Sequence, residues 1–152
     1  MKLISHRGNI SGPKPSKEND PEYIDDAIDG GFDVEIDLRY HTSTMSLWLG
    51  HDKLQYKIDL LWLVKRNKQL WIHCKNIDTL DYMSNSTNEF NYFWHENDTY
   101  TLTSKKIIWS NVNTPSTLNS VVLMPEWSDS DFSKLKFKNC YGVCSDYISK
   151  LK

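Results

Sequence analysis

The sequence predicts an α/β fold built on a mainly parallel sheet. Short β-type runs recur along the whole chain, and segments with helical spacing lie between several of them. Several runs are nearly all apolar, as strands that are buried on both faces should be. The eight runs are residues 3–8, 33–40, 46–52, 69–75, 91–96, 107–111, 120–126 and 141–147.

Three helices are expected between these strands. Asp20 can cap the first helix, with Pro21 at its first position and Gly30 at its end. Residues 58–65 carry enough aliphatic side chains for a short buried helix, and residues 77–83 have apolar side chains at helical spacing. The later connections are too polar and too short for more than about one helical turn each.

The number of strands and the length of the chain favour different architectures. Eight parallel strands suggest closure into a barrel, but such barrels normally need about 250 residues, whereas this chain has 152. From periodicity alone, the alternative is an open α/β or α+β sheet of five or six strands. The length predicts a single domain over residues 1–152, and no repeat or linker divides it.

Composition and charge exclude several classes of protein. Hydrophobic residues make up 39% and charged residues 25%, which is typical of a folded globular chain. A net charge of -2 gives no support for a nucleic-acid partner. No apolar run is long enough for a membrane span, and the apolar start is too short for a signal peptide, so a cytoplasmic location is expected. The oligomeric state stays open.

The cysteines are expected to be structural. Cys74, Cys140 and Cys144 cannot all pair, and their spacing fits neither a zinc ribbon nor a redox pair. They are therefore predicted to be reduced thiols that pack as small apolar side chains.

Four of the five histidines fall at or near the end of a predicted strand: His6, His51, His73 and His95. In a parallel barrel, the carboxyl ends of the strands share one rim, where functional groups meet. One histidine in such a place is more often structural than catalytic. Four histidines at one level, together with basic and acidic side chains, favour a functional site.

Two pairs of polar residues have strand spacing. Glu35 and Asp37 lie two residues apart, so both carboxylates point to one face and repel each other unless a cation lies between them or one is protonated. Their oxygens suit Mg²⁺ or Ca²⁺, although an exposed acidic edge would give the same pattern. His73 and Lys75 share this spacing, and an interior lysine needs an anion, which a phosphate beside Arg7 would supply.

Five short motifs, in order, resemble those of the glycerophosphodiester phosphodiesterase family, within the PI-PLC-like phosphodiesterase superfamily. They are HRGN (6–9), EN (18–19), DVEIDLR (33–39), GHD (50–52) and IHCK (72–75), and GVCSDYI near the end of the chain is similar to the family's closing strand. The resemblance implies a shortened TIM-type (β/α)8 barrel with helices reduced or missing, mainly in the second half.

The resemblance also implies roles for residues that match the motifs. His6 and His51 would be the general acid and base of a two-histidine mechanism. Arg7 and Lys75 would bind the phosphate of the substrate, and Glu18 would support Arg7.

One divalent metal ion is the cofactor that the resemblance implies, with Glu35, Asp37 and His73 as its ligands. His73 stands where the family has a glutamate. Mg²⁺ or Ca²⁺ would suit the two carboxylates, whereas the imidazole favours Mn²⁺ or Zn²⁺. Loss of metal binding is the alternative, because the site has one negative charge fewer than the family pattern.

The expected activity is metal-dependent hydrolysis of a small phosphodiester, such as a glycerophosphodiester or a related sugar-phosphate diester. The alternatives are a lyase-like phosphodiesterase that releases a cyclic phosphate, a non-catalytic phosphate-binding protein on the same barrel, and an unrelated fold with coincidental motifs. Beyond the motifs, Trp94 or His95 is expected to line the pocket, with Trp94 the candidate for stacking on the organic part of the substrate. Packing of both side chains at the rim is the other interpretation.

Overall fold

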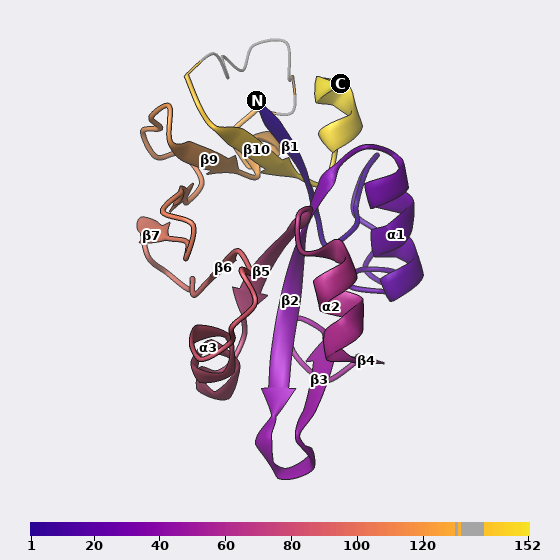
Figure 1. Ribbon diagram of the computed structural model, residues 1–152. Helices are drawn as coiled ribbons and strands as arrows, with labels where there is room; N and C mark the ends of the chain where they lie inside the picture. The colour runs from indigo at the N-terminus through magenta and orange to yellow at the C-terminus, as the bar shows by residue number, and fades with distance from the viewer. Residues whose placement is uncertain (130, 132–138) are drawn as a thin grey trace.

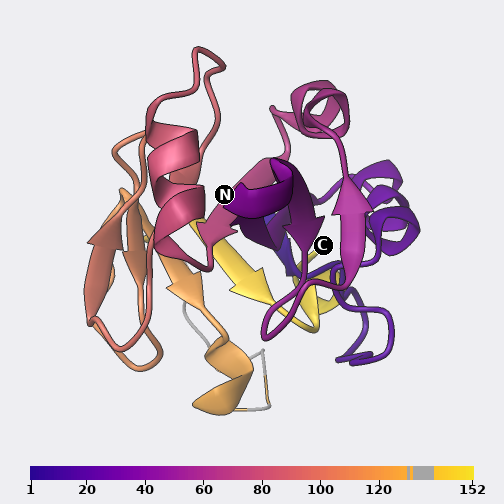
Figure 2. The ribbon, with the colours of Figure 1, turned by 90° about the horizontal axis from the view of Figure 1, so that it is seen from below.

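A single curled sheet carries the fold. In the computed structural model, which describes residues 1–129, 131 and 139–152, ten strands form one mixed sheet. Figures 1 and 2 show that this sheet curls into a half-barrel, with helices on one part of its outer face.

The central strands are parallel and run in the order β6–β5–β2–β1–β10–β9–β8. The first strand, β1, therefore lies between β2 and the last strand, β10, which brings the two ends of the chain together in the sheet. The bounds are Lys2–His6 (β1), Asp33–His41 (β2), Leu70–Cys74 (β5), Tyr92–Phe93 (β6), Ile108–Ser110 (β8), Ser120–Leu123 (β9) and Gly142–Ser145 (β10).

Three further strands are antiparallel to their neighbours. The long strand β2 extends beyond β1 and pairs with β3 (Ser46–Leu49), which in turn pairs with β4 (Tyr56–Ile58). The short 3₁₀ helix η1 (Thr42–Thr44) makes the connection between β2 and β3. At the other end of the sheet, β7 (Tyr100–Leu102) pairs with β8. The predicted strand at 46–52 forms over Ser46–Leu49 and makes a hairpin with β2, whereas β4 and β7 were not predicted.

The three predicted helices form, each with a side-chain cap at its first turn. They are α1 (Pro21–Asp29), α2 (Leu60–Arg66) and α3 (Ile77–Ser84), and their caps are Asp20, Asp59 and Asn76. Each cap accepts a backbone N–H and so satisfies a donor that the helix cannot. Within the described chain, no helix is both long and apolar enough to cross a membrane.

The predicted (β/α)8 barrel, and with it the TIM-barrel assignment, is wrong. Among the described residues the sheet is mixed, and its three α-helices all end by residue 84. The segment 111–119 between β8 and β9 is shorter than a crossover helix with its loops requires. The last strand is followed by the single 3₁₀ helix η3 (Ile148–Leu151). The chain therefore builds a half-barrel that is mostly sheet.

Side-chain alternation along β2 divides the interior from the outer face. Val34, Ile36 and Leu38 belong to the apolar cluster that also holds buried residues of the three helices. Glu35 and Asp37 point the other way, to the concave side, where an aromatic cluster that includes Trp71, Phe93 and Trp109 fills the half-barrel. The apolar stripe is thus what holds the two carboxylates inside the curled sheet.

Candidate active site

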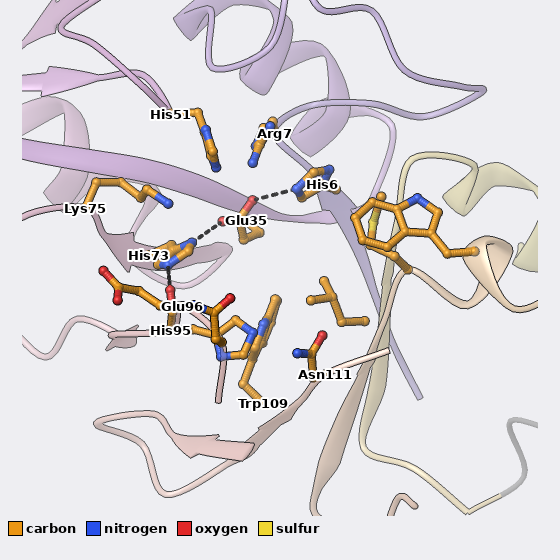
Figure 3. Close-up of a pocket in the computed structure, with 14 residues that line it drawn as sticks. His6, Arg7, Glu35, His51, His73, Lys75, His95, Glu96, Trp109 and Asn111 are labelled. Atoms are coloured by element: carbon orange, nitrogen blue, oxygen red, sulfur yellow. Dashed lines mark hydrogen bonds and ion pairs between the residues drawn. The ribbon is translucent and has the colours of Figure 1, made fainter. Parts of the chain in front are cut away.

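A cavity of about 510 Å³ opens at the carboxyl ends of the central strands. Figure 3 shows its labelled side chains gathered around Glu35 of β2. Seven of the ten predicted site residues line this cavity: His6, Arg7, Glu35, His51, His73, Lys75 and His95. They come from segments far apart in the sequence, which the parallel strand order brings to one end of the half-barrel.

Glu35, Asp37 and His73 form a group that could hold a metal ion, because one ligand atom from each lies within 4.8 Å of the others. The Nδ1 atom of His73 is 3.5 Å from a carboxylate oxygen of each acid. Its Nε2–H donates to the carbonyl oxygen of His95 at 2.7 Å. This bond fixes the tautomer, so a neutral His73 presents its Nδ1 lone pair to the space between the carboxylates.

The two carboxylates are buried and only partly satisfied. Glu35 is 2% exposed and Asp37 is 0% exposed. Oε2 of Glu35 and Oδ1 of Asp37 have no hydrogen-bond partner among the described residues, which costs about 1–3 kcal/mol for each such atom. A divalent cation would satisfy both oxygens, and a set of two oxygens and one imidazole nitrogen suits Mg²⁺, Mn²⁺ or Zn²⁺. The residues therefore fit a metal ion.

The groups around Glu35 lower the pKa of its carboxyl group and so favour the ionised carboxylate. Burial alone would raise its pKa. When His73 is charged it has a proton on Nδ1 as well. Its hydrogen bond to Glu35, with the positive charges of His6, His73 and Arg7, then outweighs burial and lowers the pKa of Glu35 to about 2. Glu35 is therefore a carboxylate, able to bind a cation, at neutral pH.

Asn19 orients the second acid. Its Nδ2–H donates to Oδ2 of Asp37 at 2.9 Å, and its Oδ1 accepts the backbone N–H of Asp37 at 2.9 Å. Asn19 adopts a left-handed backbone (φ 64°), a conformation that asparagine tolerates better than most residues. With Oδ2 of Asp37 held in this way, Oδ1 is the oxygen left for a cation. Sequence analysis quoted the EN motif but gave Asn19 no role.

Arg7 reaches the site through a tight turn directly after β1. It has φ 53° and Gly8 has φ 93°, so the chain reverses and the guanidinium points back to the carboxylates. Its Nε lies 2.8 Å from Oδ2 of Asp37, and its Nη1–H donates to Glu18 at 3.1 Å. Burial would lower the pKa of Arg7, but the charges of Asp37, Glu35 and Glu18 raise it overall. Arg7 is thus a fixed cation at the cavity.

His6 is oriented by Asp146, which follows β10. The Nδ1–H of His6 donates to Oδ1 of Asp146 at 2.8 Å, and Nε2 lies 3.9 Å from Oε2 of Glu35. Asp146 is held in turn by the side-chain amide of Asn9 at 2.8 Å and by its own N–H, which donates to Glu126 at 2.8 Å. Burial alone would lower the pKa of His6, but the Asp146 hydrogen bond and the Glu35 charge raise it. This pair leaves Nε2 facing the cavity, in the geometry of a general base.

His51 and Lys75 also point into the cavity, with His51 beside Arg7 (Figure 3). His51 is at the rim, with a side chain that is 40% exposed and with Nδ1 2.7 Å from Oδ1 of Asp52. The Nζ atom of Lys75 is 3.8 Å from Oδ1 of Asp37. Both groups can therefore reach a phosphate bound beside Arg7.

The side chain of Arg39 connects the loop that carries His51 to the end of β5, which carries Lys75. Its Nε–H donates to the carbonyl of Gly50 at 3.0 Å, its Nη1–H to the carbonyl of Lys75 at 3.4 Å, and its Nη2–H to the carbonyl of His51. Sequence analysis did not single out Arg39, because nothing local shows that its side chain meets three backbone oxygens.

The remaining predicted residues divide between the cavity and the core. Glu18 lies behind Arg7, as its hydrogen bond shows. His95 lines the cavity and is 7% exposed, and burial lowers its pKa. Trp94 is not among the cavity-lining residues and packs, partly buried, against the apolar cluster of the helical face. Trp109, to which sequence analysis gave no role, lines the cavity instead.

No family model, curated protein or solved structure matches this chain. What the site can do is therefore argued from its own groups. They are a group that could hold a metal ion, the two positive charges of Arg7 and Lys75, and three further imidazoles that line the same cavity.

Proposed function

We propose that this protein hydrolyses a phosphodiester with the help of one divalent metal ion. The observation that carries the proposal is the convergence of both imidazoles, His6 and His51, on the cavity that also contains the possible metal ligands. The motif resemblance to glycerophosphodiester phosphodiesterases points to the same chemistry, although the half-barrel is not the barrel which that resemblance implied.

The charge balance of the site supports an anionic substrate. Around Asp37, Arg7 and Lys75 contribute two positive charges, and Glu18, Glu35 and Asp37 contribute three negative ones, which leaves -1. Glu96, which also lines the cavity, is outside this group of ion-paired side chains. A divalent cation would change this balance to +1. A phosphodiester carries one negative charge, so the site with its ion would be complementary to it.

Each group has a defined part in the proposed reaction. Glu35, Asp37 and His73 would hold the metal ion, which supplies a Lewis acid for the phosphoryl oxygens when bound. His6, with its tautomer fixed by Asp146, would remove a proton from the attacking water at Nε2. His51, at the rim, would protonate the leaving alkoxide.

Arg7 and Lys75 would hold the phosphoryl oxygens while charge develops on them. Arg7 presents a guanidinium that is fixed by its two acidic partners, whereas Lys75 supplies a point charge from the end of β5, and both side chains approach Asp37. The phosphorus atom would thus be positioned between the two imidazoles.

Turnover of an alkyl phosphodiester, whose alkoxide leaving group needs a proton, by histidine variants tests the proposal. His6→Ala and His51→Ala should each lower kcat by about 10²–10⁴-fold, the usual contribution of a positioned acid or base. His41→Ala is the matched control, because His41 is exposed, bonds to Thr44 and does not line the cavity. Wild-type turnover in either site variant would remove that histidine from the mechanism.

Phosphorus NMR of the products of a glycerophosphodiester separates two reactions. Hydrolysis gives an acyclic phosphate monoester, whereas attack by a neighbouring substrate hydroxyl gives a cyclic phosphate. We expect the acyclic product. Accumulation of a cyclic product would identify the lyase-like alternative instead.

A second candidate function is phosphate binding without turnover. It is favoured by His73, which takes the place of a third carboxylate, and by the contacts of Asp37 with Arg7 and Asn19, which occupy one of its two oxygens. Binding of inorganic phosphate that needs a divalent ion, with no hydrolysis of any diester, would support this function over catalysis.

A further inference from the structure

The cavity has two unlike halves. All of its charged and imidazole groups named above come from β1, β2, the loop after β3, and the ends of β5 and β6. The facing half comes from β8, β9 and the 3₁₀ helix η2 (Pro125–Trp127), and it carries Trp109, Leu123, Met124 and Trp127. Figure 3 shows Trp109 on the opposite side of the cavity from His51 and Lys75.

Trp127 is the exposed part of this apolar half. Its side chain is 68% exposed, whereas Trp109 is 2% and Met124 1% exposed. A large aromatic side chain that lines a polar cavity and stays open to solvent is typical of a ligand contact, because burying it against a ligand is favourable.

The segment that carries Trp127 is anchored to the catalytic side of the cavity. Its neighbour Glu126 accepts the hydroxyl of Ser145 at 2.9 Å with each carboxylate oxygen and the N–H of Asp146 at 2.8 Å. Asp146 is also the partner of His6. The backbone that carries Trp127 is therefore anchored beside Asp146, the partner of the proposed base.

Few polar groups are left on this half to bind a hydroxyl or a cation. The side chain of Asn111 already makes one hydrogen bond with each of its polar atoms, since its Nδ2 donates to the carbonyl of Asp98 at 3.3 Å and its Oδ1 accepts the N–H of Val112 at 2.8 Å. Glu96, the acid of the lining that pairs with none of the site cations, lies near His73 and His95 rather than by Trp109 (Figure 3). A hydroxyl-rich group placed against the tryptophans would lose water without gaining partners.

We propose that one alcohol of the substrate carries an uncharged apolar group of about the size of a ring, which lies against Trp109 and Trp127. This inference rests on the proposed function and narrows it. The phosphate binds beside Arg7 and Lys75, and the apolar substituent extends toward β8 and η2. The substrate class is then an aryl or alkyl phosphodiester rather than one with two small polar alcohols.

Calorimetric binding of three phosphate monoesters, in the presence of Mn²⁺, tests the inference. Phenyl phosphate should bind at least about tenfold more tightly than methyl phosphate, because a buried ring removes apolar area from water. Phosphocholine should show no such preference over methyl phosphate, since no acid faces the tryptophans. Trp127→Ala should lower the phenyl-to-methyl ratio about threefold or more.

Leu118→Ala is the control, because Leu118 is 76% exposed and lies outside the cavity lining. It should leave the phenyl-to-methyl ratio unchanged. A wild-type ratio near one, a ratio that Trp127→Ala does not change, or a preference for phosphocholine would overturn the inference while leaving a phosphate site in place. If no monoester binds, the phosphate site of the proposed function fails as well.

Discussion

Replacement of Arg39 should separate activity from stability, because Arg39 holds the backbone of two site segments and does not line the cavity. Arg39→Ala removes three hydrogen bonds from a cation to carbonyl oxygens. A bond from a charged donor is worth about 1.5–3 kcal/mol when fully buried. Since Arg39 is partly exposed, a total loss of about 2–4 kcal/mol is expected. For a domain of this size, that loss lowers Tm by about 4–15 °C.

The effect on kcat should exceed what the loss of stability explains. Without Arg39, the carbonyls of His51 and Lys75 lose their common donor, and a displacement of about 1 Å at a catalytic group can lower the rate by roughly 10²-fold. Arg39→Lys should recover only part of this rate, because a single ammonium cannot reproduce the planar set of donors. Added guanidinium at low concentration should raise kcat of Arg39→Ala but not of the wild type.

Arg66→Ala is the matched control for this experiment. Arg66 also makes several side-chain bonds, two of them to Asp25 at 2.5 and 2.6 Å, but it lies on α2, outside the cavity lining. It should lower Tm while kcat, measured well below Tm, stays near that of the wild type. Wild-type kcat in Arg39→Ala, or an equal loss of kcat in Arg66→Ala, would refute the reasoning.

Three further predictions test other parts of the structure. Asp146→Asn should lower kcat by about 10²–10⁴-fold with an unchanged circular dichroism spectrum. The amide can donate to Nδ1 of His6, which places the imidazole proton on Nε2, where the proposed base needs a lone pair. A kcat equal to that of the wild type would contradict this. Gly50→Ala should lower both Tm and turnover. Gly50 has φ 145°, and an added Cβ would overlap the backbone oxygen of Lys53 in the loop that carries His51. An unchanged Tm would contradict this. Iodoacetamide should modify Cys140, which is partly exposed, well before the two buried cysteines, and mass spectrometry that finds a buried cysteine modified first would contradict the packing.

Local pattern was enough to predict the elements that hold the metal-binding group. Alternation along residues 33–38 separates Val34 and Ile36 from Glu35 and Asp37, and the structure follows that alternation. The three helices also follow from local signals, because each begins at a capping side chain. Strand alternation and helix caps depend on residues that are close in the sequence, so they can be predicted before the fold is known.

The features that sequence analysis missed depend on contacts between distant segments. Asp146 meets His6 across 140 positions, and the contact follows only from the pairing of β1 with β10. The bonds of Arg39 depend on the hairpin of β2 with β3. A strand at 46–52 was predicted, but its antiparallel pairing with β2 was not specified. The family resemblance implied a closed barrel, but after α3 the described part of the chain contains no α-helix of the kind that such a barrel needs.

Titration of turnover with Mn²⁺ after chelation tests the central claim most directly, in the wild type and in Glu35→Gln. Hydrolysis of bis(p-nitrophenyl) phosphate by the wild type should fall to background without metal and rise to saturation as Mn²⁺ is added. Glu35→Gln keeps the shape of the side chain but loses its charge, so half-saturation should need at least about tenfold more Mn²⁺. Turnover that is unaffected by the chelator, or the same half-saturation in both proteins, would contradict a metal-assisted reaction at Glu35, Asp37 and His73.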